Sequence, residues 1–147
     1  MNRRLQIALV TTLIAGAIFA YFHFDFGGEK KIHIMHRKGP IPGRWGNRNP
    51  ILFMLDKTYP LTSVKVVNVA DELTNKYPHA YWHLMASNYA DAKEITYGFP
   101  IRGMHPEVPK TRAEPLQPDV DYKLIVEAGK WKGEYVFQVP TNSAPKR

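Results

Sequence analysis

The sequence predicts an all-β fold, a small antiparallel sandwich, preceded by one transmembrane α-helix and an extended basic arm. From residue 51 onward, short apolar runs rich in Val, Ile, Tyr and Phe alternate with Pro, Gly, Asn and Asp, which is typical of strands and turns. Residues 122–128 alternate between apolar and polar side chains with the period of two of a half-buried strand. Residues 5–24 contain no charged side chain, and about 20 such residues match the ~30 Å hydrocarbon core of a bilayer.

These features divide the 147 residues into four parts. Residues 1–26 form the predicted N-terminal transmembrane anchor, 27–50 a basic Gly/Pro-rich arm, 51–140 the β-sandwich domain, and 141–147 a disordered tail. About 120 residues remain beyond the anchor, which is enough for one domain with its own core. The chain has no cysteine, and this excludes disulfides, thiolate metal sites and cysteine catalysis.

The apolar stretch has two interpretations. Arg3 and Arg4 precede it, as in a secretory signal peptide, but cleavage after Ala17 would leave IFAYFHF exposed, so an uncleaved anchor is predicted. The predicted location is a bacterial-type inner membrane, with the N-terminus in the cytoplasm and the domain outside. A literal count of Lys and Arg on both sides favours the opposite orientation. Three small residues would let another transmembrane helix approach closely: Ala15, Gly16 and Ala17.

Most of the net charge lies in the arm. It carries six cations and one anion, a net charge of +5 within a formal total of +7. The predicted contacts to a partner protein or to anionic lipid headgroups are Lys30, Lys31, Arg37, Lys38, Arg44, Trp45 and Arg48. A solvated linker is the alternative. Nucleic-acid binding is not predicted, because a stacking platform needs several aromatics among the cations and the arm has one.

Six strands and one short helix are expected in the domain. The strands are Ile51–Leu55, Thr62–Ala70, Ala80–Ser87, Glu94–Phe99, Tyr122–Ala128 and Glu134–Val139. The apolar face switches between Val66 and Val67, which indicates a bulge or a strand covered on both sides. A helix of one or two turns is expected after Val69, and Pro78 stops it. Five prolines between residues 100 and 119 predict a long irregular connection.

One motif resembles a known fold family. Leu116-Gln-Pro118-Asp-Val-Asp-Tyr122-Lys-Leu-Ile-Val resembles the Leu-x-Pro-x-x-x-Tyr signature of fibronectin type III and immunoglobulin-like sandwiches. The resemblance implies that Tyr122 is a corner residue whose hydroxyl bonds to the backbone upstream, with Leu116 and Pro118 shaping the turn. Trp82 lies in the third predicted strand, nearer the immunoglobulin pattern. A glycine is usual where Asp119 stands, and a small open β-barrel is the alternative fold.

Little in the chain indicates catalysis or a metal site. His33 and His36, with Met35 between them, lack a further ligand, and the lysines and arginines nearby disfavour a cation. His79 and His83 would lie ~13 Å apart along a strand, too far to share an ion. His105 has no visible partner in the sequence. No nucleophile motif, phosphate loop or metalloprotease motif is present, so the sequence predicts neither an enzyme nor a cofactor.

The leading functional hypothesis is a non-catalytic, single-pass accessory subunit that docks on a larger membrane protein assembly, such as a respiratory or photosynthetic complex. Its partners would be other membrane subunits. The alternative is a membrane-anchored envelope module that binds a glycan or a peptide through the loop 100–118, with Tyr97, Phe99, Arg102 and His105 as candidates. A third possibility is an enzyme accessory domain that is anchored near its substrate. The fold by itself does not separate these functions.

Overall fold

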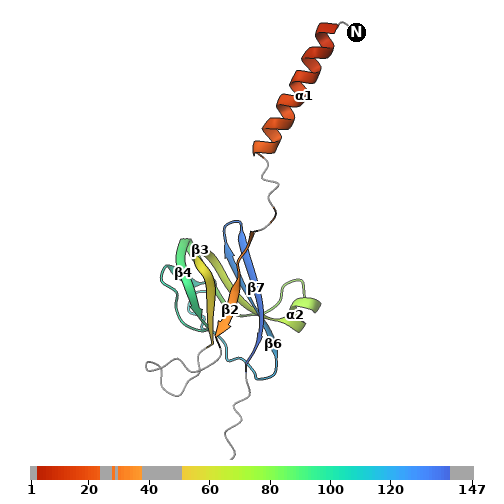
Figure 1. Ribbon diagram of the computed structural model, residues 1–147. Coiled ribbons are helices and arrows are strands. Elements are labelled where there is room, and N and C mark those ends of the chain that lie inside the picture. The colour runs from red at the N-terminus through yellow and green to blue at the C-terminus, as the bar shows by residue number, and fades with distance from the viewer. Residues whose placement is uncertain (1–2, 24–27, 29, 38–50, 140–147) are drawn as a thin grey trace, which may run out of the picture.

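The computed structural model describes residues 3–23, 28, 30–37 and 51–139. Within these residues two helices and seven strands follow one another along the chain. They are α1 (Arg3–His23), β1 (Lys30–Lys31), β2 (Ile34–Arg37), β3 (Leu52–Asn68), α2 (Val69–Thr74), β4 (Ala80–Thr96), β5 (Met104–Pro106), β6 (Asp121–Ala128) and β7 (Trp131–Gln138). The strands form one sheet in the order β1-β7-β6-β3-β4-β5, and β2 pairs with β3 (Figure 1).

The fold is mostly β, as predicted, but the predicted antiparallel sandwich is wrong. All seven strands belong to one mixed sheet, in which β1 runs parallel to β7 and the other strand pairs are antiparallel. The parallel pair arises because the chain around Lys30 runs alongside the start of β7. No local pattern predicts this pairing, because two consecutive lysines do not resemble a strand.

The predicted membrane anchor is also overturned. Within the described part of the chain, no helix combines the length and the apolar character needed to cross a bilayer. Helix α1 starts at Arg3 and ends at His23, and polar side chains such as Gln6 and Thr11 stand among its apolar residues. This finding contradicts the transmembrane helix over residues 1–26, the single-pass topology and the inner-membrane location.

Two of the strands are long, and each replaces two predicted ones. β3 changes neighbours along its length: residues 52–55 pair with β2, and residues 63–68 pair with β6. Between these parts the register of β3 against β4 shifts, between Met54 and Tyr59. Pro60 lies in this stretch, where β4 is the one strand paired with β3 among the described residues, so its missing N–H costs little. This irregular stretch, called the bend of β3 below, has residues that resemble a turn in the sequence.

Residues 30–37, here called the closing segment, connect β7 to β3. The Ile32 amide donates to the Lys132 carbonyl oxygen over 2.9 Å, and one residue later the His33 carbonyl oxygen accepts from the Asp56 amide over 3.1 Å. Ile32 is buried in the core. The first part of the predicted basic arm is therefore an element of the folded sheet, whereas residues 38–50 lie outside the described residues.

Gly133 allows the closing segment to approach β7. A Cβ at this position would lie 2.9 Å from both the Cβ and the carbonyl oxygen of Ile32. Real side chains essentially never approach a backbone atom so closely, so a glycine is required for the two strands to meet here.

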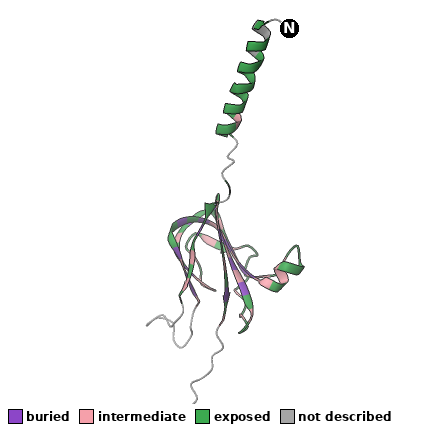
Figure 2. Ribbon diagram, turned by 45° about the vertical axis from the view of Figure 1, so that its right-hand side comes forward, coloured by how far each residue is buried: buried purple, intermediate pink, exposed green. Residues whose placement is uncertain are grey.

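The core lies inside the curve of the sheet, where Figure 2 shows buried residues along its strands. β6 contributes the four alternate residues predicted from its period: Tyr122, Leu124, Val126 and Ala128. Phe53 and Phe137 meet edge to face with their ring centroids 4.8 Å apart. The register of β3 against β4 shifts between Val66 and Val67, but the extra residue lies on β4, and the pairing of β3 with β6 is uninterrupted there. Both valines are 0% exposed, so the strand covered on both sides is the explanation that the burial supports.

Helix α2 is short because its caps fix both ends. The Asn68 side chain accepts from the Ala70 amide over 2.8 Å, which is an N-cap, and the Asn75 amide donates to the Asp71 carbonyl oxygen over 2.8 Å. The predicted helix after Val69 is confirmed, and it ends before the proline that was expected to stop it.

Candidate functional site

A cavity of about 1000 Å³ opens beside the ends of β3, β4 and β7. Its size is at the upper end of the range typical of small-ligand sites. Trp82 and Leu84 form a buried part of its wall. The other lining residues are Ile51, Tyr97, Gly98, Phe99, Pro100, Met104, Pro106, Thr111, Arg112, Ala113, Glu114, Pro115, Leu116 and Val139.

The aromatic side of the cavity is set by the end of β4. Trp82 and Tyr97 pack edge to face, with centroids 5.4 Å apart. The Tyr97 amide donates to the Ile51 carbonyl oxygen over 3.0 Å, so the chain stays attached to the sheet just before it turns. Gly98 follows at φ +78°, a conformation that favours glycine, and the turn brings Phe99 to the cavity.

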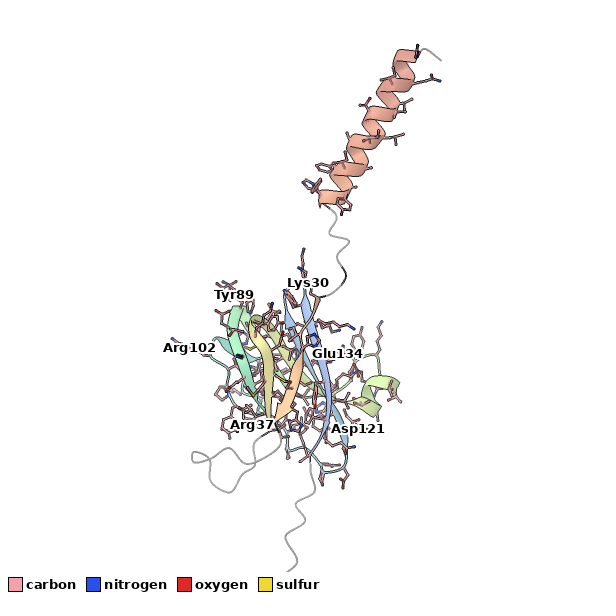
Figure 3. The ribbon with its side chains drawn as sticks, viewed as in Figure 1. Lys30, Arg37, Tyr89, Arg102, Asp121 and Glu134 are labelled. Carbon is pink, nitrogen blue, oxygen red and sulfur yellow. The ribbon has the colours of Figure 1, made fainter. Side chains whose placement is uncertain are left out.

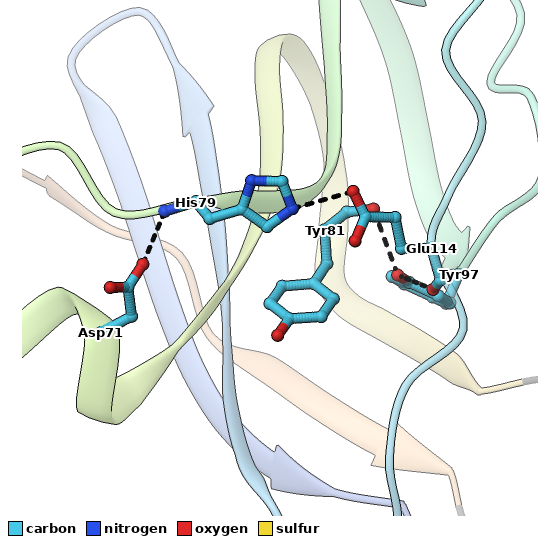
Figure 4. A network of polar contacts seen from close by, with 5 residues as sticks. All are labelled: Asp71, His79, Tyr81, Tyr97 and Glu114. Atoms are coloured by element: carbon cyan, nitrogen blue, oxygen red, sulfur yellow. Dashed lines mark hydrogen bonds and ion pairs between the residues drawn. The ribbon is translucent and has the colours of Figure 1, made fainter.

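The opposite side is formed by residues 107–118, here called the strap. Its backbone is fixed to the sheet at Glu114, whose amide donates to the Tyr81 carbonyl oxygen over 2.9 Å. The Glu114 carbonyl oxygen in turn accepts from the Tyr97 hydroxyl over 2.7 Å (Figure 4). Further along, the Gln117 amide donates to the Tyr122 hydroxyl over 3.0 Å. This last contact is the one that the tyrosine-corner motif implies.

Two histidines hold carboxylates of the strap. His79 Nε2 lies 2.8 Å from Glu114 Oε1, and His83 Nδ1 lies 2.5 Å from Glu107 Oε2. The His79 amide also donates to Asp71 Oδ2 over 2.6 Å, so the network in Figure 4 reaches from helix α2 to the strap. Hydrogen bonds from the His79 amide and the Asn75 side chain lower the pKa of the Asp71 carboxyl below its ordinary value.

Burial raises the pKa of the Tyr97 hydroxyl well above its ordinary value, and the charge of Glu114 adds to the rise. Tyr97 therefore keeps its proton and stays a hydrogen-bond donor to the strap at every physiological pH. The cavity wall is thus held by a neutral donor that does not titrate in that range.

A second polar cluster lies on β3, β4 and the strap. Ser63 Oγ is 3.2 Å from His83 Nε2, and the other ring nitrogen of His83 faces Glu107. A serine, a histidine and a carboxylate in this order resemble a nucleophile with its base, but acyl transfer also needs N–H donors aimed at an oxyanion. Ser63 lies inside the ladder, paired with Met85 on one side and Glu127 on the other, where backbone amides are used by the sheet. We interpret the cluster as a contact that ties the strap to the sheet.

Sequence reasoning found part of the cavity. Tyr97 and Phe99 line it, and so do Trp82 and Leu116, which were expected only to be structural. Arg102 and His105 lie outside its lining, and His105 Nδ1 faces the Pro106 carbonyl oxygen over 3.2 Å. The strap residues Thr111–Pro115 were not singled out as lining, although the loop 100–118 that contains them was the predicted binding element.

The predicted contact residues of the arm are not brought together. Lys30 and Lys31 lie in β1, and Arg37 lies at the far end of the closing segment, as Figure 3 shows. Lys38, Arg44, Trp45 and Arg48 lie outside the described residues. In α1, the predicted packing residues Ala15, Gly16 and Ala17 are exposed, and a Cβ on Gly16 would meet nothing within 4 Å.

No metal site is evident in the described ranges, where no group of three or more His, Cys, Asp or Glu residues could hold an ion. His36 packs against the rings of Phe53, Tyr135 and Phe137. His79 and His83 face different glutamates, and His33 uses its carbonyl oxygen in the sheet.

Comparison of the chain with protein-family models, curated proteins and solved structures found no match. The resemblance to fibronectin type III domains rests on the motif alone and stays a prediction.

Proposed function

We propose that this protein is a non-catalytic binding module whose cavity takes an extended, apolar, proline-containing segment of a partner protein. The observation that carries the proposal is the lining of the cavity, which combines three aromatic side chains with three prolines: Trp82, Tyr97, Phe99, Pro100, Pro106 and Pro115. Aromatic-lined grooves are the recurrent docking surface for extended proline-rich peptides. The proposal retains the docking on a partner protein that the sequence predicted, without the membrane anchor.

The polar groups of the cavity favour a peptide over a glycan. A sugar ring needs several hydrogen-bond partners, but the Tyr97 hydroxyl is already used on the strap and the Glu114 carboxylate faces His79. Thr111 Oγ1 donates to the Val108 carbonyl oxygen over 2.7 Å. Arg112 is exposed beside the cavity and can donate to a peptide carbonyl or carboxylate.

The test is a binding titration of the full chain with an uncharged ten-residue peptide of alternating leucine and proline, followed by tryptophan fluorescence. A linear glucan oligomer of similar length is the comparison ligand. Saturable binding of the peptide and weaker or no binding of the glucan support the proposal. Tighter binding of the glucan, or no saturation with either ligand, contradicts it.

A pair of variants locates the binding. Thr111→Trp places a large side chain in the cavity at an exposed lining position, whereas Val108→Trp adds the same bulk on the strap outside the lining. We expect Thr111→Trp to weaken peptide binding about tenfold or more, because the cavity volume is lost. Val108→Trp should leave it unchanged, and an equal loss in both variants would contradict binding in the cavity.

A further inference from the structure

The end of the sheet opposite the cavity gathers lysines around one tryptophan. β7 begins at Trp131, and Val139, just after its end, lines the cavity, so the two regions are separated by the length of an eight-residue strand, roughly 25 Å. We call the first region the basic end. It consists of Lys30, Lys31, Lys57, Lys130 and Lys132 with Trp131.

The lysines come from three parts of the chain that the closing segment joins. Lys30 lies opposite Trp131 and Lys31 opposite Lys132 in the parallel pair of β1 and β7. Lys57 comes from the bend of β3, and its Nζ lies 4.4 Å from the centroid of the Trp131 ring. Lys30 Nζ lies 5.4 Å from the same ring. Figure 3 shows Lys30 at the end of the sheet away from Arg37 and Asp121.

Within the described ranges, three of these lysines have no carboxylate partner, and Lys132 shares one. Glu134 lies 3.3 Å from Lys132 Nζ, but it is shared with Lys123, whose Nζ lies 3.6 Å away. Asp56 accepts from the Tyr59 hydroxyl over 3.0 Å. Lys30, Lys31 and Lys57 are exposed, and none of the three forms an ion pair with another described residue. Like charges held close together without counter-charges raise the local potential and attract an anionic partner.

A depression of about 490 Å³ adjoins these lysines. Lys31 and Lys132 line it, together with His33, Gly133 and Glu134. A carboxylate side chain entering it would meet ammonium groups from both β1 and β7. Glu134 lines one side of the depression and pairs with Lys132, so Lys31 is the ammonium group left for an incoming carboxylate.

We propose that the basic end binds an acidic segment of a partner protein. Two observations favour a polypeptide carboxylate over a nucleic acid. All five cations are lysines, whereas the planar guanidinium of arginine is the preferred partner of phosphate. The Trp131 ring is covered by Lys30 and Lys57, so it does not offer an open face on which a base can stack.

The experiment measures fluorescence anisotropy of a labelled ten-residue polyglutamate peptide with the full chain at several salt concentrations. We expect saturable binding that weakens as salt is added. Lys30→Gln with Lys57→Gln should lower the affinity about tenfold, because both substitutions remove charge from the basic end. The matched control is Lys76→Gln with Lys110→Gln, which removes the same charge elsewhere and should have less than about a twofold effect.

Several results would overturn the proposal. They are the absence of peptide binding, equal losses in the two double variants, or tighter binding of a ten-nucleotide single-stranded DNA or of phosphatidylserine vesicles than of the peptide. Lys57→Arg keeps the charge and should keep the affinity, which separates lost charge from a damaged fold. Thr111→Trp should bind polyglutamate normally, so failure of the cavity proposal and failure of this one can be distinguished.

Discussion

The Tyr97 hydroxyl donates to the Glu114 carbonyl oxygen over 2.7 Å and thereby joins the two walls of the cavity. One residue supplies an aromatic face to the site and also holds the segment opposite. The carboxylate of Glu114 contacts His79, so both the backbone and the side chain of this residue attach the strap to the sheet.

Tyr97→Phe should keep the aromatic face and lose the hydrogen bond to the Glu114 carbonyl oxygen. We expect a stability loss of about 1 kcal/mol, the usual net worth of one hydrogen bond, and weaker binding of the leucine–proline peptide. Denaturant unfolding and the fluorescence titration measure the two effects. Tyr135→Phe is the control, since no hydrogen bond of that hydroxyl is seen in the described residues. Equal stability losses in the two variants would contradict the role of the Tyr97 hydroxyl.

The tyrosine corner can be tested in the same way. Tyr122→Phe removes the acceptor of the Gln117 amide from a side chain that is 1% exposed. Because the amide of the strap is left without its partner, we expect a loss of about 1–3 kcal/mol in the free energy of unfolding. Chemical denaturation measures this value, and a variant as stable as the parent would show that the contact is dispensable.

Gly133→Ala should weaken the attachment of the closing segment. The new Cβ would meet the Ile32 carbonyl oxygen at 2.9 Å, and backbone cannot move aside cheaply, so we expect a loss of about 1–3 kcal/mol. Gly28→Ala is the matched control, because a Cβ there meets nothing within 4 Å. Thermal unfolding of both variants measures the difference. Equal melting temperatures would contradict the close approach of the closing segment at Gly133.

Ile32→Ala tests whether the closing segment belongs to the core. Removing a side chain that is 4% exposed should cost about 2–5 kcal/mol, whereas Met35→Ala, at a position that is 56% exposed, should cost far less. An extended arm outside the core, as the sequence predicted, would make both substitutions nearly neutral. Comparing the two midpoints in urea distinguishes these cases.

The Asp71 carboxyl should contribute to acid sensitivity. Its pKa is lowered in the folded state, so the folded protein binds its proton more weakly than the unfolded chain does. The stabilisation is present above the unfolded pKa of about 4 and is lost as the pH falls through the lower, folded value. Asp71→Asn removes the titration, so its stability should fall less steeply than that of the parent below about pH 4. Unfolding curves between neutral and acid pH measure this, and parallel curves would contradict it.

Local sequence patterns predicted a strand well where it keeps the same neighbouring strands along its whole length. The alternation from Tyr122 to Ala128 placed β6 and its buried face, and the switch after Val66 marked a point where β3 is buried on both faces. The bend of β3 could not be predicted, because Asp56, Lys57 and Pro60 resemble a turn and their pairing depends on strands far away in sequence. The same holds for β1, whose two lysines pair only because β7 lies beside them.

The site was predicted in part for a related reason. Tyr97 and Phe99 stand out as aromatics at the end of an apolar run, and the prolines of the strap mark an irregular segment. Which strap residues face the cavity depends on where Tyr81 and Tyr97 hold Glu114, and these contacts span 17 residues or more. The gathering of Lys57 with Lys30 and Trp131 spans still more of the chain, so no local pattern reveals it.

The parallel pairing of residues 30–32 with the final strand has a consequence for biosynthesis. While the ribosome has yet to release residues 131–138, Lys30 and Ile32 have no strand to receive them, and the core stays open on that side. The sheet is therefore completed only once residues 131–138 have left the ribosome, and a nascent polypeptide stalled before Trp131 should remain sensitive to protease.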